Sequence, residues 1–177
     1  MSKATETAPV IPARVRTVTW QDPSISAKQV GAGSGLEFLQ KVVRGELPPP
    51  PIAELLGFRL AEVEPGRAVF EFEPAEFHYN PIGVVHGAMA GMLLDSAMGC
   101  SVQTTLPAGS GYTTLEFKVN LLRAVTMKTG LMRAEGKVIH VGSRVAAAEG
   151  WLVDAADKIY AHATTTCLVF PINAERG

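Results

Sequence analysis

The sequence has no excess of charge of either sign. Sixteen Lys and Arg residues stand against seventeen Asp and Glu residues, and the formal net charge of the 177 residues is −1 at pH 7. The basic residues form no stripe or run along the chain, which is the pattern that a polyanion partner would require. We therefore expect no nucleic acid among the partners of this protein.

Long apolar runs and cysteines are also scarce. The longest mainly apolar run, Val84–Leu94, ends at Asp95 and is shorter than the roughly 20 apolar residues of a membrane-spanning helix. The N-terminus carries no apolar segment of the signal-peptide kind. The two cysteines, Cys100 and Cys167, lie in apolar segments without the spacing of metal ligands and are expected to be buried thiols in a reducing compartment. These absences predict a cytoplasmic protein with no membrane contact and no bound metal.

What is present is enough apolar sequence for one domain. The apolar fraction is 47%, and a usual domain has about 100 to 150 residues. Residues 1–35 mix Thr, Ala, Pro, Ser and Gly without periodicity and are predicted to be a flexible N-terminal arm. Residues 36–57 are predicted to form a helical collar, with Ser34 as its N-cap and an extended Pro-rich segment at 48–51. The main domain is predicted to comprise residues 58–172.

The main domain begins with strand patterns, continues with a helix and returns to strands. Residues 58–72 have the alternation and turn residues of a β-hairpin, and one long apolar helix is predicted from about Val84 to about Thr104. Such a helix can bury itself only against the concave face of an antiparallel sheet, so the predicted fold class is α+β. Four further strand patterns follow the helix, at 115–121, 131–141, 145–153 and 159–170.

The first strand after the helix alternates strictly. Every second residue is apolar and is predicted to face a core, while the residues between face away. Continued backwards, the same alternation turns Thr113 rather than Thr114 toward the helix. The residues predicted to face the core are Leu115, Phe117, Val119 and Leu121.

Asp95 is the only acid in the predicted helix, and its neighbours are small or aliphatic. Burying an unpaired carboxylate is costly, so we expect Asp95 to be paired, hydrogen-bonded or used in chemistry. The residues alone support a structural acid and a functional acid about equally.

The segment around this acid resembles the signature of a known family. Asn80-x-x-Gly83-x-x-His86-Gly87, with Asp95 eight positions after Gly87, is similar to the motif of hotdog-fold acyl-coenzyme A thioesterases of the phenylacetate-pathway (PaaI-like) and 4-hydroxybenzoyl type. The resemblance covers about residues 55–170. It is supported by the strand at 115–123, by Gly142-Ser143-Arg144 and by Ala161–Thr166.

The resemblance implies a hotdog fold, a long central helix wrapped by an antiparallel β-sheet. It also implies a hydrolase that splits an acyl-coenzyme A (acyl-CoA) thioester into free acid and CoA. No cofactor is implied, because CoA is part of the substrate, and the expected assembly is a homodimer or a dimer of dimers. Ala88 and Ala124 depart from the Gly and Pro that are common in the family, and they leave the acyl group and the subfamily open.

The resemblance also assigns roles in the site. Asp95 is implied as nucleophile or general base, and the backbone N–H of Gly87 as the group that polarises the thioester carbonyl. The Asn80 amide would orient water or the carbonyl, and His86 would be a structural or thioester-contacting neighbour. Thr114 would hold water and the acid, although strict alternation favours Thr113.

A length argument separates Gly87 from Asp95. Eight residues of α-helix rise about 12 Å, so the Gly87 N–H and the Asp95 carboxylate of one helix cannot both touch one carbonyl. If both act, they belong to different subunits, as in a two-fold dimer with antiparallel helices.

Two other functions remain open from the sequence. One is a non-catalytic module that binds or senses acyl-CoA on the same fold. The other is a dehydratase acting on hydroxyacyl thioesters, for which His86 is the only candidate base. Arg123 and Arg144 could meet CoA phosphates or be solvated surface charges. The remaining histidines, which have no metal-ligand spacing, are interpreted as loop or strand residues and are His78, His140 and His162.

Overall fold

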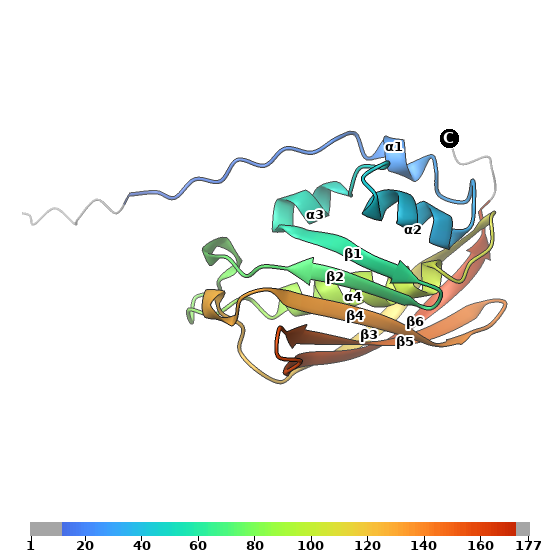
Figure 1. Cartoon of the computed structure of the whole chain (residues 1–177). Coiled ribbons are helices and arrows are strands. Elements are labelled where there is room, and N and C mark those ends of the chain that lie inside the picture. The colour runs from blue at the N-terminus through green and yellow to red at the C-terminus, as the bar shows by residue number, and fades with distance from the viewer. Residues whose placement is uncertain (1–11, 173–177) are drawn as a thin grey trace, which may run out of the picture.

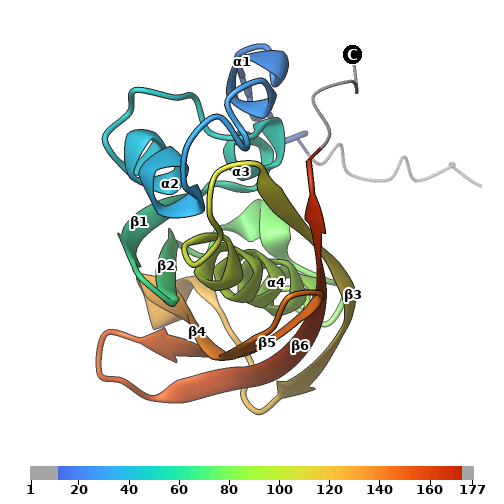
Figure 2. The ribbon, with the colours of Figure 1, turned by 90° about the vertical axis from the view of Figure 1, so that its right-hand side faces the viewer.

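The structure, a computed structural model, describes residues 12–172. A six-stranded antiparallel sheet, in the order β1-β2-β4-β5-β6-β3, curves around the long helix α4 (Ala88–Gln103), as Figures 1 and 2 show. The predicted α+β class and the predicted helix in the concave face of the sheet are both confirmed. The strands are β1 (Phe58–Glu64), β2 (Arg67–Phe72), β3 (Ser110–Leu121), β4 (Met132–Val141), β5 (Val145–Asp154) and β6 (Ile159–Pro171).

Helix α4 lies directly on the backbone of the central strands β4 and β5. A Cβ on Gly136 of β4 would lie 2.2 Å from the carbonyl oxygen of Ala97, and a Cβ on Gly150 of β5 would lie 3.0 Å from Cγ of Met98. The two glycines therefore leave the helix the space that side chains would fill. The sheet-facing side of α4 is fully buried, with Leu94, Ala97 and Met98 at 0% exposure.

Short helices lie beside the first strands of the sheet (Figure 1). The second and third are the collar predicted at 36–57, whereas the first lies in the segment 1–35 predicted to be a flexible arm and packs with the other two. Ser34 caps the second helix as predicted, because its hydroxyl accepts from the Glu37 N–H and the Glu37 carboxylate accepts from the Ser34 N–H. A Cβ on Gly35 would lie 1.8 Å from the carbonyl oxygen of Gln103, so this helix begins in direct contact with the end of α4. In the structure the collar comprises α1 (Ser24–Ala27), α2 (Gly35–Val43) and α3 (Pro51–Leu56), and the 3₁₀ helices η1 (Glu76–His78) and η2 (Met127–Thr129) lie further along the chain.

The predicted arm at 1–35 is described from residue 12 onward, and residues 1–11 lie outside the described residues. Arg16 connects this segment to the body of the domain. Its guanidinium donates to the carbonyl oxygens of Glu54 and Leu55 in α3 and lies 4.0 Å from the centroid of the Phe77 ring.

The predicted start of the long helix is wrong by four residues. Helix α4 begins at Ala88 rather than near Val84. Val85 instead forms an isolated bridge with Tyr79, and its N–H donates to the carbonyl oxygen of Val125 at 2.9 Å. Val125 is distant in sequence, so local helical periodicity could not show that residues 84–86 lie outside the helix.

The alternation predicted for the strand after the helix holds from Phe117 to Leu121, whose side chains pack on the glycines of α4 and its N-cap, but its continuation back to Thr113 is wrong. The pairing of β3 with β6 shifts between Thr114 and Glu116, which is the signature of a β-bulge. Before the bulge the even-numbered Tyr112 faces α4, packing on Gly99, and after it the odd-numbered Phe117 does so, packing on Gly91. One extra residue in the strand therefore reverses which side chains face the helix.

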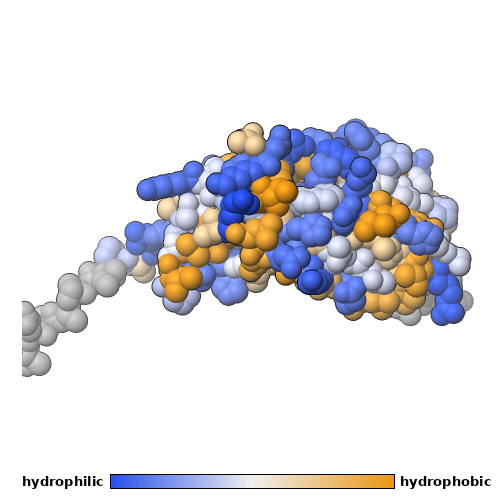
Figure 3. All heavy atoms as spheres, turned by 90° about the horizontal axis from the view of Figure 1, so that it is seen from below, coloured by the Kyte–Doolittle hydropathy of each residue, from blue (hydrophilic) through white to orange (hydrophobic). Residues whose placement is uncertain are grey.

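Strand β3 is the edge of the sheet, and within residues 12–172 it pairs with β6 alone. Phe117 is 42% exposed and Leu115 and Leu121 are each 58% exposed, so their predicted burial in a core does not hold for the single chain. Figure 3 shows apolar patches among polar side chains on the face of the molecule seen from below. Exposed apolar side chains on an edge strand are a surface that a partner usually covers.

Candidate functional site

Asp95 lies in the middle of α4 on the side that faces β3. It is half-buried, and its Oδ1 accepts a hydrogen bond from the Thr114 hydroxyl at 2.9 Å. Thr113 is exposed, so between the two threonines it is Thr114 that reaches the acid. The bulge after Thr114 explains why alternation pointed to the wrong residue. No other group in residues 12–172 hydrogen-bonds this carboxylate, which leaves its second oxygen for a ligand or water.

Two neighbouring side chains stay neutral beside Asp95. Burial, together with the charge of Asp95, raises the pKa of the Cys100 thiol to about 12. Burial likewise raises the pKa of the Tyr112 hydroxyl well above its usual value. A thiol with such a pKa is not a thiolate near neutral pH, so Cys100 is not an activated nucleophile.

The backbone N–H of Gly87 is a free donor at the start of α4. Gly87 is the N-cap residue, and its N–H has no acceptor among residues 12–172. The next two N–H groups are both occupied, since Ala88 donates to Nδ1 of His86 at 3.0 Å and Met89 donates to the His86 carbonyl oxygen at 2.9 Å. A free N–H at the positive end of the helix dipole suits a carbonyl oxygen or oxyanion.

The ring of His86 acts as a backbone acceptor. Because Nδ1 accepts from the Ala88 N–H, the neutral ring carries its proton on Nε2. The residue is otherwise exposed. The expected contact between this ring and nearby backbone is present, and it joins the ring to the first residue of α4.

Asn80 shapes the loop that leads to Gly87. Its side-chain oxygen accepts from the N–H groups of Ile82 at 3.1 Å and Val84 at 3.3 Å, which closes the turn 80–84. The side-chain NH₂ group has no acceptor among residues 12–172. Asn80 thus combines the turn role expected from the sequence with one free donor beside the helix start.

His78 was missed by the sequence interpretation, which treated it as an ordinary loop residue. It is 5% exposed, its Nε2–H donates to the Leu56 carbonyl oxygen at 2.8 Å, and its Nδ1 accepts from the Ala75 N–H at 2.9 Å. Its own carbonyl oxygen accepts from the His86 N–H at 2.8 Å. His78 therefore joins the collar to the loop that carries Gly87. Only its position two residues before Asn80 hinted at this role.

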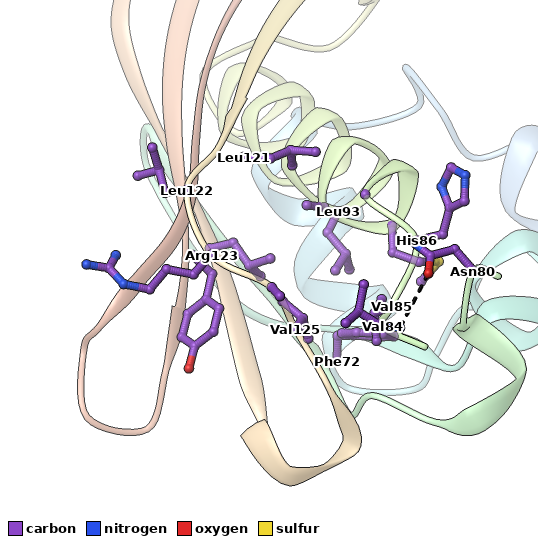
Figure 4. A pocket seen from close by; sticks show the side chains of 16 residues that line it. Phe72, Asn80, Val84, Val85, His86, Leu93, Leu121, Leu122, Arg123 and Val125 are labelled. Carbon is purple, nitrogen blue, oxygen red and sulfur yellow. Dashed lines mark hydrogen bonds between the residues drawn. The ribbon is translucent and has the colours of Figure 1, made fainter. Parts of the chain in front are cut away.

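A cavity of about 300 Å³ lies at the start of α4. Figure 4 shows Asn80 and His86 on one side, Arg123 on the other, and Leu93 between them. The Arg123 guanidinium donates to the carbonyl oxygen of Ile159. Asp95 does not line this cavity.

A groove connects Asp95 with Gly87 along the surface of α4. It runs over Gly91 and is walled by the exposed side chains of Phe117 and Leu121 on β3. The structure thus brings Asn80, His86 and Gly87 together around the cavity at the start of α4. Gly87 also lies at one end of the groove, and Asp95, bonded to Thr114, lies at the other. Arg144, the second predicted phosphate contact, is exposed in the turn between β4 and β5 and lines none of these cavities.

Two absences concern the described part of the chain. No group of three or more His, Cys, Asp or Glu side chains in residues 12–172 is placed to hold a metal ion. Across the same residues, no helix has the length and apolarity needed to cross a membrane.

The comparisons with known proteins agree on one family. The model of the thioesterase superfamily matches residues 82–166. The 1,4-dihydroxy-2-naphthoyl-CoA hydrolase of Listeria monocytogenes is 26% identical over 108 residues, which are 61% of this chain and 86% of that protein.

Solved structures give the same result. A phenylacetic acid degradation-related protein from Ralstonia eutropha is 30% identical with a TM-score of 0.66, covering 73% of this chain and 97% of that one. The E. coli PaaI protein is 18% identical with a TM-score of 0.64, covering 70% of this chain and 87% of that one, and it supports the fold alone.

The long helix in the concave face of an antiparallel sheet is thus a hotdog domain, as the sequence motif implied. The chain belongs to the thioesterase superfamily, and the protein is a thioesterase.

The buried His78 predicts a dependence of stability on pH. Burial, aided by the nearby Arg16, lowers the pKa of His78 below its usual 6.5. The unfolded chain therefore binds a proton first as the pH falls, so the contribution of His78 is complete above about pH 6.5 and is lost as the pH falls through the lower folded-state pKa. His78→Gln should lower the free energy of unfolding by about 1–3 kcal/mol at pH 7.5, because buried polar groups lose their partner.

Urea unfolding between pH 7.5 and 5 measures both effects. We expect the His78→Gln protein to lose part of the pH slope of the unaltered protein, while the exposed His140→Gln control keeps it. An equal slope in all three proteins would contradict this role of His78.

Proposed function

We propose that this thioesterase hydrolyses an acyl-CoA thioester to the free acid and CoA at a site shared by two subunits. Asp95 serves as nucleophile or general base, and the Gly87 N–H of the partner subunit polarises the thioester carbonyl. The observation that carries the proposal is the separation of a carboxylate and a free N–H along one groove of α4. The name of the curated relative, a CoA hydrolase, supports a CoA thioester as the substrate class.

A homodimer supplies the missing half of each site. If two copies place their α4 helices side by side and antiparallel, Gly87 of one copy lies opposite Asp95 of the other, and the two-fold axis creates two equivalent sites. The groove is suited to such an approach, since Gly91 at its centre carries no side chain and Phe117 and Leu121 offer exposed apolar surface.

The chemistry balances with water as the only co-reactant. With Asp95 as base, the carboxylate takes a proton from water, the hydroxide adds to the thioester carbon, and the Gly87 N–H stabilises the oxyanion. The C–S bond then breaks, and the CoA thiolate takes the proton from Asp95. With Asp95 as nucleophile, an anhydride forms first and water hydrolyses it. Neither route requires a metal or a redox cofactor.

The neighbouring residues support these steps. The Thr114 hydroxyl fixes one carboxylate oxygen of Asp95 and directs the other toward the substrate. The free NH₂ group of Asn80 orients the water or the carbonyl. His86 occupies the Ala88 N–H and so leaves Gly87 as the donor at the helix start.

Asp95→Asn should lower the rate of acyl-CoA hydrolysis by at least about 100-fold, the lower range for loss of an acid–base group. Release of free thiol from a panel of acyl-CoA thioesters measures the rate, and sedimentation shows whether the dimer is retained, as we expect. The exposed Glu116→Gln serves as a control that keeps full activity. Undiminished hydrolysis by Asp95→Asn would rule out the mechanism, and an unaltered protein that binds acyl-CoA without hydrolysing it would be a binding module instead.

The two adjacent threonines provide a matched pair. Thr114→Val should reduce kcat about 10-fold, because a hydrogen bond to a charged group contributes about 1.5–3 kcal/mol. Thr113→Val makes the same chemical change on the exposed side of β3 and should leave kcat unaltered. Equal effects of the two substitutions would show that the contact between Thr114 and Asp95 has no part in the reaction.

A further inference from the structure

A separate cavity of about 420 Å³ lies between the collar and the body of the domain. Its outer wall is formed by α1, α2 and the segment Pro48–Pro50, and its inner wall by β1, β2 and α4. Asp95, Ser96 and Cys100 lie along the α4 side of this cavity. The collar cavity thus meets the proposed reaction site at the carboxylate, on the side of Asp95 away from the groove to Gly87.

The lining of the collar cavity is almost entirely uncharged. Asp95 is the only ionised side chain in it, since Cys100 and Tyr112 are held neutral by burial. The hydroxyl of Ser26 is already used, because it donates to the Pro48 carbonyl oxygen at 2.7 Å. Ser96 on α4 adds a second hydroxyl to the lining. The remaining side chains are apolar, and the volume is within the range of about 300–1,000 Å³ that small-molecule sites occupy.

The collar is fixed over this cavity by specific contacts. The Gly35 N–H donates to the Leu106 carbonyl oxygen at 2.9 Å, which seats the start of α2 on the chain beyond α4. The hydrogen bond from Ser26 joins α1 to the proline segment. The prolines at 48–50 favour an extended segment, with Pro50 in the extended conformation, and Pro51 begins α3, so the predicted extended segment at 48–51 is one residue too long. The collar also lies outside residues 82–166, the part of the chain that the family model matches.

We propose that the collar cavity holds the acyl group of the thioester, that this group is apolar and of medium size, and that Phe38 and Val42 of α2 limit its length. The proposal rests on the proposed function, because it uses Asp95 as the reacting group. A thioester carbonyl at Asp95 can extend its acyl chain under the collar while CoA remains outside.

The same lining rejects acyl groups that carry a charge. A second carboxylate, as in a dicarboxylic acyl group, would be buried among apolar side chains beside the negative Asp95, and no cation in the lining compensates it. Octanoyl-CoA is therefore a suitable probe, with acetyl-CoA as the probe that does not reach the far wall.

Val42 and Val43 allow a matched test. Val42 lines the collar cavity, whereas Val43 is 38% exposed and does not line it. Val42→Phe should lower kcat/KM for octanoyl-CoA about 10-fold or more, the discrimination that small changes in an apolar pocket produce. It should leave kcat/KM for acetyl-CoA within about twofold, which also shows that the variant is folded. Val43→Phe should change kcat/KM for neither thioester. Phe38→Ala should raise the activity toward thioesters with longer acyl chains relative to the activity toward octanoyl-CoA.

Two results with Val42→Phe would overturn the assignment of the collar cavity as the acyl site: an equal loss of activity toward both thioesters, or no loss toward either. Both results would leave the proposed function intact. A binding measurement separates the two proposals if no thioester is hydrolysed. Calorimetry on Asp95→Asn should show octanoyl-CoA bound at least about 10-fold more tightly than CoA, and addition of Val42→Phe should abolish that difference. Equal binding of octanoyl-CoA and CoA by Asp95→Asn would refute the acyl site whatever the unaltered protein hydrolyses.

Discussion

The close packing of α4 on the sheet is the constraint on which the rest of the structure depends. Gly136 and Gly150 let the helix approach the backbone of β4 and β5, and Leu94 and Met98 are buried at that contact. Successive residues of an α-helix are about 100° apart around its axis, so Asp95, next to Leu94, is turned from the sheet centre toward β3. The packing of the core therefore decides where the acid lies and that Thr114 can reach it.

The same packing of α4 leaves open space on two sides of Asp95. On one side the groove leads along α4 to the free N–H of Gly87, and on the other side the collar cavity opens under α2. The groove is walled by exposed apolar residues of an edge strand, whereas the collar cavity is closed by the chain itself. In the proposals above, a second subunit covers the groove and an apolar acyl group occupies the collar cavity, so that Asp95 reacts at the boundary between the two subunits.

Much of the fold could be predicted because its signals are local. Ser34 capped its helix as expected, and the alternating segments formed strands because period and turn chemistry agreed. The predicted start of α4 was wrong because Val85 forms a β-bridge with Tyr79 and donates a backbone hydrogen bond to Val125. Only the folded chain brings these residues together. The choice between Thr113 and Thr114 depended on a bulge that exists only in the pairing of β3 with β6. The role of His78 and the collar cavity both depend on contacts between residues distant in sequence. No local sequence pattern could therefore predict them.

The sharing of each site between two subunits is tested most directly by mixing two inactive variants. Asp95→Asn removes the acid, and Gly87→Pro removes the free N–H at a φ of −58° that suits proline, with a Cβ that displaces the movable end of Leu121. Each variant alone should be inactive. After mixing and exchange of subunits, half of the dimers carry one intact site, so about a quarter of the unaltered activity should return. A mixture no more active than its components would contradict a site built from two chains.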